Sequence, residues 1–401
     1  MNPLRRLYCH LYQGILGIAM DFLNFKEPEI KEGVASVPAI LNDWKATKPL
    51  IVTDSMINKL GLTKGLEDAL KSKSIGYVLF SDVVPNPTFE CIHKALKMYK
   101  DSNCDSLIAL GGGSSIDTAK AIGALVANPK KDLMKLGGTL KVTHVYPNLI
   151  AIPTTAGTGS EATVAAVVVN EKTHYKFSIN DPHLIPRVAI HDDTLLMKLP
   201  GKVISTTGMD ALTHAVEAYI GHTRTEKTKR YSLEATKLIS EYLFRFYSNP
   251  SDDEARKMML KASYLAGVSF TRSYVGYVHA IAHSLGGEYN VPHGLANAVI
   301  LPHVLKRYGS SCYKALSELA FAAGVGKDTS DKKTNALAFI SWIEDMNKKM
   351  NIPSTFDHLI KPADISLLSK RADKEANPLY PVPKEMDAAE LASIYKEIDP
   401  Q

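Results

Sequence analysis

The chain has 401 residues, of which 45% are apolar and 22% are charged. This composition is typical of a soluble protein, and the length exceeds what one hydrophobic core usually organises, so we expect two domains. The 47 basic and 42 acidic residues leave a formal net charge of only +5, and no basic run alternates with aromatic residues, which argues against a nucleic-acid partner.

The first 24 residues predict an amphipathic helix. Arg5 and Arg6 precede an apolar stretch, as in a signal sequence, but Tyr12, Gln13 and Asp21 interrupt that stretch and no small-residue cleavage site follows it. The stretch is also too short and too polar to span a bilayer. We expect the helix to pack on the protein body or on a second subunit, with docking to a membrane surface as the alternative. Its apolar residues recur at nearly helical spacing: Leu4, Leu7, Tyr8, Leu11, Ile15, Ile18, Met20 and Phe22.

From residue 49 to about residue 190, short β-branched runs alternate with helical patterns. This rhythm predicts βαβ units and a mostly parallel sheet, so we assign residues 1–200 to an α/β domain that includes the N-terminal helix. The expected strands are 49–54, 76–80, 106–110, 149–152, 165–169 and 188–190, and helices are expected up to residue 71, at 89–99 and at 115–126.

After Pro200 the pattern changes to long stretches with helical periodicity. Strand-like runs become rare, and prolines mark the breaks between helices. We therefore assign residues 201–401 to an all-helical domain. The expected helices are 202–219, 225–247, 254–270, 295–308, 313–323, 332–350 and 387–398.

A glycine-rich turn lies where a predicted strand passes into a helix. Its glycines allow close backbone approach, and its amides could hold a pyrophosphate at the positive end of the helix. It is not a GxGxxG motif and does not follow the first strand, so a tight turn without a ligand remains open on this stretch alone. The turn comprises Gly111, Gly112, Gly113, Ser114, Ser115, Ile116 and Asp117.

Three further polar segments follow predicted strands and strengthen the nucleotide hypothesis. Asp54 ends the first strand of the expected sheet, where a carboxylate could bind ribose hydroxyls and repel a 2′-phosphate, which favours NAD over NADP. Asn86 lies in a turn after the second strand. Open α/β sheets bind nucleotides at the carboxyl ends of successive strands. The third segment, 153–160, offers the hydroxyls of Thr154, Thr155, Thr158 and Ser160.

The histidines cluster in the helical half. Asp210 and His214 are four residues apart on a predicted helix and share one face, a spacing that suits a metal but also occurs in ordinary helices. A second segment carries His279, His283 and His293, and its glycines allow the chain to turn so that the last of these returns to the same site. One carboxylate with two or three imidazoles and no thiolate suits Fe(II) or Zn(II) with an open coordination position. His303, farther along a new helix, is expected to be structural.

Together these motifs resemble the iron-containing alcohol dehydrogenase family, from about Val52 to Pro383. The likeness rests on the turn 111–114, the Pro-Asn-Pro-Thr turn at 85–88, and the segments 153–161, 208–214 and 276–303. The resemblance implies an N-terminal dinucleotide-binding α/β domain and an all-α C-terminal domain, the dehydroquinate-synthase-like fold, with a metal between them.

The resemblance also implies residue roles. Asp210, His214, His279 and His293 would bind the metal, which leaves His283 beside the nicotinamide as the catalytic candidate. For two further residues, the only ground is that their positions match functional positions of the family: Lys176 would contact the cofactor, and Phe270 would line the substrate pocket.

The implied reaction is hydride transfer between NAD(H) and a small primary alcohol, aldehyde or diol. The cation would stabilise the alkoxide, and His283 would relay the proton to solvent. Two enzymes of the same architecture are alternatives, a polyol oxidase resembling glycerol dehydrogenase and a lyase of the dehydroquinate-synthase kind. The lyase would need a pocket rich in cations, whereas Arg272 is the only cation close in sequence to the histidines. A catalytically silent binding protein on this fold is the alternative outside enzymes.

Location and assembly follow from weaker signals. The four cysteines show neither CxxC nor framework spacing, which fits a reducing compartment, so we expect a cytoplasmic protein. The resemblance implies a homodimer or a larger homo-oligomer, for which the N-terminal helix is a candidate interface. No nucleic-acid partner and no membrane span are expected.

Overall fold

The computed structural model describes residues 1–22, 25–143, 145–173 and 175–400, and for residues 16–22 it describes the backbone only. Ile18, Met20 and Phe22 of the predicted apolar face are therefore outside the described side chains. The chain divides into two compact units, one of residues 26–198 and one of residues 1–25 together with 199–401. No helix in the described ranges is long and apolar enough to cross a membrane.

The unit of residues 26–198 is built on a six-stranded parallel sheet. The strand order is β1-β9-β6-β4-β2-β3, and every pairing in this sheet is parallel. The three strands β2, β4 and β6 carry the apolar runs and are almost completely buried. The strands are β1 (Glu29–Glu32), β2 (Pro49–Asp54), β3 (Val78–Val83), β4 (Ser106–Gly111), β6 (Asn148–Pro153) and β9 (Val188–His191).

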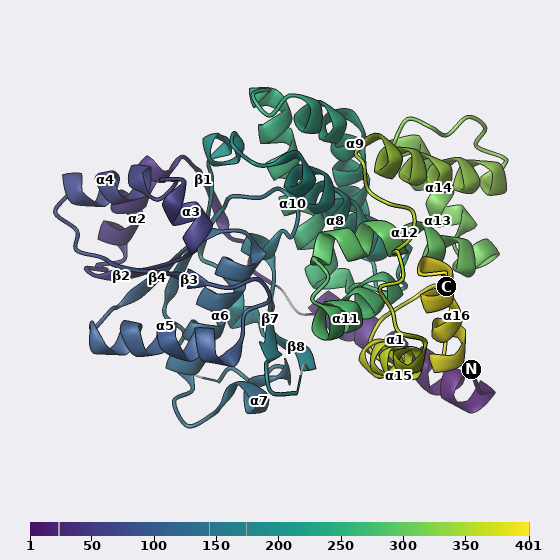
Figure 1. The fold of residues 1–401 in the computed structure, drawn as a ribbon, viewed down its shortest axis with the longest axis horizontal. Helices are drawn as coiled ribbons and strands as arrows, with labels where there is room; N and C mark the ends of the chain where they lie inside the picture. Colours follow the sequence, from purple (N-terminus) through teal and green to yellow (C-terminus); the bar gives the residue numbers. More distant parts are fainter. Residues whose placement is uncertain (23–24, 144, 174, 401) are drawn as a thin grey trace. The chain divides into compact units, whose positions relative to one another are not determined.

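Helices and a second small sheet complete this unit. Helices α5 and α6 pack against strands β3 and β4 (Figure 1). In the three-stranded sheet, β7 (Ala165–Asn170) pairs antiparallel with β8 (Tyr175–Asn180), and β8 pairs with β5 (Gly138–Thr139). The helices are α2 (Val37–Asp43), α3 (Ser55–Lys59), α4 (Lys64–Ser72), α5 (Phe89–Asp101), α6 (Gly113–Ala127) and α7 (Leu133–Leu136).

The other unit is helical, and α8 lies at its centre. Residues 208–220 of α8 are all buried, and the helix contacts α9, α10 and α12. A helix that is buried on every side must find partners for its polar side chains inside the protein. The helices are α1 (Pro3–Phe22), α8 (Gly201–Ile220), α9 (Glu226–Ser248), α10 (Asp253–Ser273), α11 (Tyr277–Tyr289), α12 (His293–Tyr308), α13 (Tyr313–Ala322), α14 (Lys332–Lys349), α15 (Ile365–Ala376) and α16 (Ala388–Ile398).

The N-terminal helix belongs to the helical unit and not to the α/β unit to which the sequence analysis assigned it. Arg5 forms a paired hydrogen bond of 2.8 Å to Asp373 of α15, and Gln13 Nε2 donates to the Tyr380 carbonyl at 2.8 Å. These contacts with the C-terminal segment explain the difference. The α/β unit ends at Lys198 and the helical unit resumes at Leu199, close to residue 200, where we expect the domain boundary from the sequence.

The turn before His293 also differs from expectation. Gly286 and Gly287, which we expected to turn the chain, lie inside α11, which continues to Tyr289. Instead, Asn290 adopts a left-handed conformation with φ 55°, which an asparagine tolerates better than most residues, and Pro292 precedes α12. As a result, His293 is the first residue of α12.

Candidate functional site

The four predicted metal ligands come together in the helical unit. Asp210 and His214 lie one turn apart on α8, His279 comes from α11, and His293 begins α12. One ligand atom from each residue lies within 4.8 Å of the others, and three of the four residues are buried. His303 is not part of this group and contacts the Ser354 carbonyl through Nε2 at 3.1 Å.

Asn297 marks the point on which the ligand atoms converge. Its amide nitrogen donates to Asp210 Oδ1 at 2.6 Å and lies 3.2 Å from Nε2 of both His279 and His293. One carboxylate oxygen and several imidazole nitrogens therefore face the same small volume without a thiolate. This donor set fits a divalent ion such as Fe(II) or Zn(II).

Aromatic stacking orders the rings around this point. The His214 ring stacks on Phe270 with centroids 4.2 Å apart, and on His279 with centroids 4.6 Å apart. Phe270, the predicted wall of the substrate pocket, thus packs directly on a predicted ligand. Its contact with substrate stays a prediction.

His283 lies outside the four-residue group, although its ring stacks on that of His293 at a centroid distance of 5.2 Å. Its Nδ1 lies 2.7 Å from Glu375 Oε1, and the Tyr380 hydroxyl donates to the same oxygen at 2.8 Å. Burial and the neighbouring Glu375 carboxylate raise the pKa of Tyr380, so this phenol remains a proton donor to Glu375. The catalytic role of His283 stays a prediction.

In the α/β unit, the predicted nucleotide residues gather where the strand order reverses. From β2 the chain crosses to β3 on one side and then to β4 on the other, so Asp54 and Gly111 end neighbouring strands. Asp54 Oδ1 accepts the amides of Met56 and Ile57 at 2.9 Å and thereby caps α3. Its other oxygen lies on the side of Gly111, 3.8 Å from where a Cβ on that glycine would be. Nucleotides bind at such reversal points.

The glycine turn is closely covered by the segment 153–160. A Cβ on Gly113 would lie 2.8 Å from Thr158 Cγ2, and a Cβ on Gly112 would lie 3.5 Å from Thr155. Helix α6 begins at Gly113, and Gly112 provides no side-chain cap. The amides of Gly113 and Ser114 precede the first hydrogen bonds of the helix, which Ser115 and Ile116 donate to the Gly112 carbonyl. Such leading amides are the groups that bind phosphate, and Ser114 is partly exposed.

Four of the side chains predicted to contact the cofactor instead face the protein interior: Ser115, Asp117, Thr154 and Ser160 are buried. Asp117 accepts the Ser160 hydroxyl at 2.7 Å and the Val167 amide at 3.1 Å, which ties α6 to the segment above it. Because burial disfavours its charged form, the pKa of Asp117 is raised. These contacts favour a role in positioning the segment 153–160 against α6.

Lys120 extends this buried network. Its ammonium donates to the Thr163 carbonyl at 2.7 Å, the Thr163 hydroxyl at 2.8 Å and the Ala165 carbonyl at 2.9 Å. Burial lowers the pKa of Lys120 to about 8.

Two other predicted cofactor residues, Asn86 and Lys176, come from different segments and contact each other. Lys176 Nζ donates to Asn86 Oδ1 at 2.9 Å.

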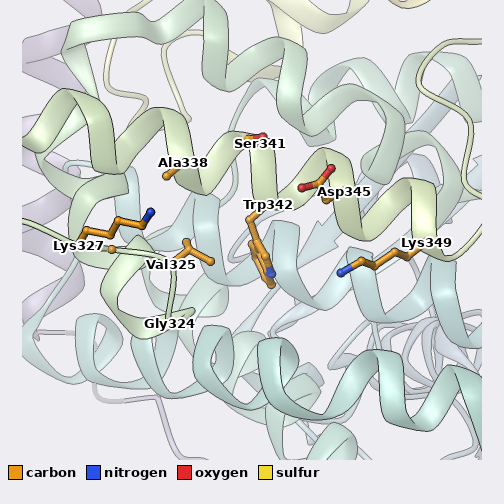
Figure 2. A pocket seen from close by; sticks show the side chains of 9 residues that line it. Gly324, Val325, Lys327, Ala338, Ser341, Trp342, Asp345 and Lys349 are labelled. Carbon is orange, nitrogen blue, oxygen red and sulfur yellow. The ribbon is translucent and has the colours of Figure 1, made fainter.

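A separate surface pocket is lined by α14 and by the loop that follows α13. Trp342 points into it between Lys327 and Lys349, and Asp345 lies at its edge (Figure 2). None of the predicted site residues lines this pocket.

Comparison with known proteins assigns the family. Residues 30–193 match the family model described as iron-containing alcohol dehydrogenase, and residues 204–398 match that of the C-terminal region of the same family. The chain belongs to the iron-containing alcohol dehydrogenase family. The predicted family, enzyme class and fold class are therefore confirmed, and iron, the predicted metal, is the metal in the family's name.

Several family members are similar over most of their length. The chain is 37% identical over 342 residues to the NAD-dependent methanol dehydrogenase of Bacillus methanolicus, covering 84% of this chain and 89% of that protein. It is 35% identical to the 1,3-propanediol dehydrogenase of Klebsiella pneumoniae, covering 87% and 91%. Its fold matches the solved structure of an Oenococcus oeni alcohol dehydrogenase with a TM-score of 0.88, at 32% identity and with coverage of 94% and 99%.

Sequence reasoning missed three residues of the helical site: Glu217, Asn297 and Glu375. Two of them had a signal in the sequence that we did not use. Glu217 follows His214 by three residues and Asn297 follows His293 by four, and this helical spacing is enough to place both near predicted ligands. Glu375 pairs with His283 across 92 residues, and no local pattern indicates that contact.

Proposed function

We propose that this family member is an NAD-dependent alcohol dehydrogenase in which Asp210, His214, His279 and His293 hold Fe(II), with Zn(II) as the alternative ion. The main support for this proposal is that four ligand atoms lie within 4.8 Å of one another at a largely buried point. A divalent cation bound there would supply Lewis acidity that favours the alkoxide form of an alcohol. Affinity alone does not select iron, since Zn(II) binds such ligands more tightly than Fe(II).

The α/β unit would bind the dinucleotide. We expect the amides at Gly113 and Ser114 to hold the pyrophosphate, with Gly111 and Gly112 allowing its approach. Asp54 has one oxygen engaged in capping α3, which leaves the other for a ribose hydroxyl. A carboxylate at this position disfavours the 2′-phosphate of NADP. Among the other predicted contacts, Asn86, Thr155, Thr158 and Lys176 are partly exposed.

His283 would take the alcohol proton. Glu375 engages its Nδ1, so Nε2 is the nitrogen that remains for exchange with substrate or water. The Glu375 carboxylate would stabilise the imidazolium formed when Nε2 accepts a proton. Its side chain is 28% exposed, which connects the pair to solvent.

A small, weakly polar substrate suits the surroundings of the histidines. Phe270 packs on His214, and the guanidinium of Arg272 donates to the Phe25 carbonyl at 2.7 Å. Relatives named for methanol, 1,3-propanediol and lactaldehyde support a short primary alcohol, diol or aldehyde. We therefore favour this class over polyols and over the phosphorylated acids of a lyase.

We further propose a cytoplasmic homo-oligomer. Cys9, Cys91, Cys104 and Cys312 are all free and buried, as expected in a reducing compartment. One face of α1 is exposed and apolar although the opposite face is fastened to the protein, which suits contact with a second copy. The exposed fraction is 77% for Leu4, 56% for Leu7, 60% for Leu11 and 70% for Ile15.

A charge on this face tests the oligomer. We expect Leu11→Glu to lower the mass measured by light scattering, because a glutamate cannot be buried between two apolar helices without a partner. Lys97→Glu, which changes an exposed residue of the α/β unit, is the control. An unchanged mass for Leu11→Glu would remove α1 from the interface.

Turnover by reconstituted protein tests the proposed activity. Metal-free protein would be loaded anaerobically with Fe(II) or Zn(II) and assayed for NADH formation on short primary alcohols, diols and glycerol, with NADP as the control cofactor. We expect metal-dependent turnover with NAD on the short alcohols. Tight NAD binding without turnover on any of them would instead support the lyase or the silent binding protein.

A further inference from the structure

Glu217 joins the two helices that carry most of the proposed metal ligands. It lies on α8, which also carries Asp210 and His214, and its carboxylate reaches the beginning of α11. The residue is only 3% exposed. A buried carboxylate is costly unless both of its oxygens have partners, and here both do.

The two oxygens make different contacts. Oε1 accepts the backbone amide of Val278 at 2.9 Å, in the first turn of α11, where Gly276 provides no side-chain cap. Oε2 lies 2.6 Å from Nδ1 of His279, the next residue. Gly276 allows this approach, because a Cβ at that position would lie 2.6 Å from Oε1.

The second contact determines which nitrogen of His279 carries the proton. A carboxylate only accepts hydrogen bonds, so Nδ1 must donate, and in a neutral imidazole Nε2 then keeps its lone pair. Nε2 is the nitrogen that lies 3.2 Å from the Asn297 amide, on the side where the other ligand atoms converge. The hydrogen bond thus selects the tautomer that can bind a cation.

We propose that Glu217 is a positioning residue that caps α11 and holds His279 in the metal-binding tautomer before any ion arrives. This inference rests on the proposed metal centre. It also accounts for charge, because Asp210 and Glu217 bring two carboxylates to an otherwise neutral set of imidazoles. Their combined charge balances that of one divalent cation.

Glu217→Gln replaces the carboxylate by an amide of nearly the same volume. This amide can satisfy the contact with Val278 or the contact that orients His279, but not both at once. If the amide oxygen faces Val278, the amide NH₂ faces His279 Nδ1 and favours the tautomer with the proton on Nε2. If the amide turns over, two donors oppose each other at Val278, and the cap of α11 is lost. In either orientation, one of the two contacts of Glu217 is lost.

The first measurement is metal affinity, independent of turnover. Metal-free full-length protein would compete for Zn(II) with a chelating dye, and we expect the Kd to rise about 10- to 100-fold in Glu217→Gln. Glu375→Gln is the matched control: it makes the same chemical change at His283, which pairs with Glu375 at 2.7 Å but lies outside the ligand group. Its Zn(II) Kd should stay within about twofold of wild type. An equal Kd in wild type and Glu217→Gln would overturn the proposal.

The second measurement reads the tautomer in the wild-type protein itself, and a variant serves only to assign the signal. Nitrogen NMR of histidine-labelled, metal-free wild-type protein, assigned with His279→Gln, should show His279 protonated on Nδ1. Protonation on Nε2 would overturn the role of Glu217, even if the metal binds well. Conversely, wild-type protein that binds neither Zn(II) nor Fe(II) would overturn the metal centre itself, and the NMR result would still decide whether Glu217 sets the tautomer.

Discussion

The two units prepare their proposed ligand sites by opposite means. The helical unit gathers side chains, bringing four ligand atoms from three helices within 4.8 Å. The α/β unit removes side chains, because Gly112 and Gly113 leave room where Thr155 and Thr158 approach the start of α6. One site should therefore fail when a side chain is deleted, and the other when a Cβ is added. Substitutions of these two kinds can be made independently.

The largest effect is expected for His279→Ala. Loss of this imidazole removes one of the four proposed ligands and leaves Oε2 of Glu217 without its partner, so turnover should fall about 10³-fold or more. Metal content measured by mass spectrometry should fall with it, while the Kd for NADH, measured by fluorescence, should stay within about twofold. Full metal content in this variant would contradict the ligand assignment.

His283→Ala should have the next largest effect. Because His283 lies outside the ligand group, the variant should keep its metal and its NADH affinity while kcat falls on the order of 10²-fold. The pH dependence of kcat should flatten at the same time. If kcat and its pH profile were unchanged, His283 would not be the proton relay.

Gly113→Ala tests the α/β site by adding one carbon. The new Cβ would lie 2.8 Å from Thr158 Cγ2, so the segment 153–160 must shift, and we expect the Kd for NADH to rise about tenfold with metal content unchanged. Gly76→Ala is the control, since nothing lies within 4 Å of its Cβ position. Equal NADH affinity in both variants would argue against binding at this turn.

The smallest effect is expected for Asp54→Asn. Asparagine caps helices about as well as aspartate, so the melting temperature should change little, whereas loss of the negative charge should raise kcat/KM with NADP a few-fold. Asp54→Ala should instead lower stability by about 1 kcal/mol through loss of the α3 cap. An unchanged preference for NAD in both variants would place the selectivity elsewhere.

The same contrast explains what could be predicted from sequence. Apolar runs identify β2, β4 and β6 because these strands are buried on both faces. Strand β1 escaped prediction because its sequence, Glu-Ile-Lys-Glu, is largely exposed at the sheet edge, where backbone pairing with β9 holds it. Local pattern does not record such pairing.

The candidate sites also contain residues that the sequence predicts and residues that only the fold reveals. Histidines and an aspartate at helical spacing indicate a metal by residue type alone, whereas the partners that orient them depend on packing. Ser115 and Asp117 show the converse, because a motif near a phosphate-binding turn cannot reveal which of its side chains face inward. The buried network of Asp117, Ser160 and Lys120 becomes visible only when α6 and the segment 153–165 are brought together.

The docking of α1 has a consequence for biosynthesis. Arg5 and Gln13 contact Asp373 and Tyr380, more than 360 residues later in the chain. Residues 26–198 therefore leave the ribosome as a complete unit between two pieces of the other unit. Until α15 and the segment around Tyr380 have been synthesised, the face of α1 that carries Arg5 and Gln13 lacks these partners, so the first helix takes its final position only after the α/β unit and most of the helical unit have left the ribosome.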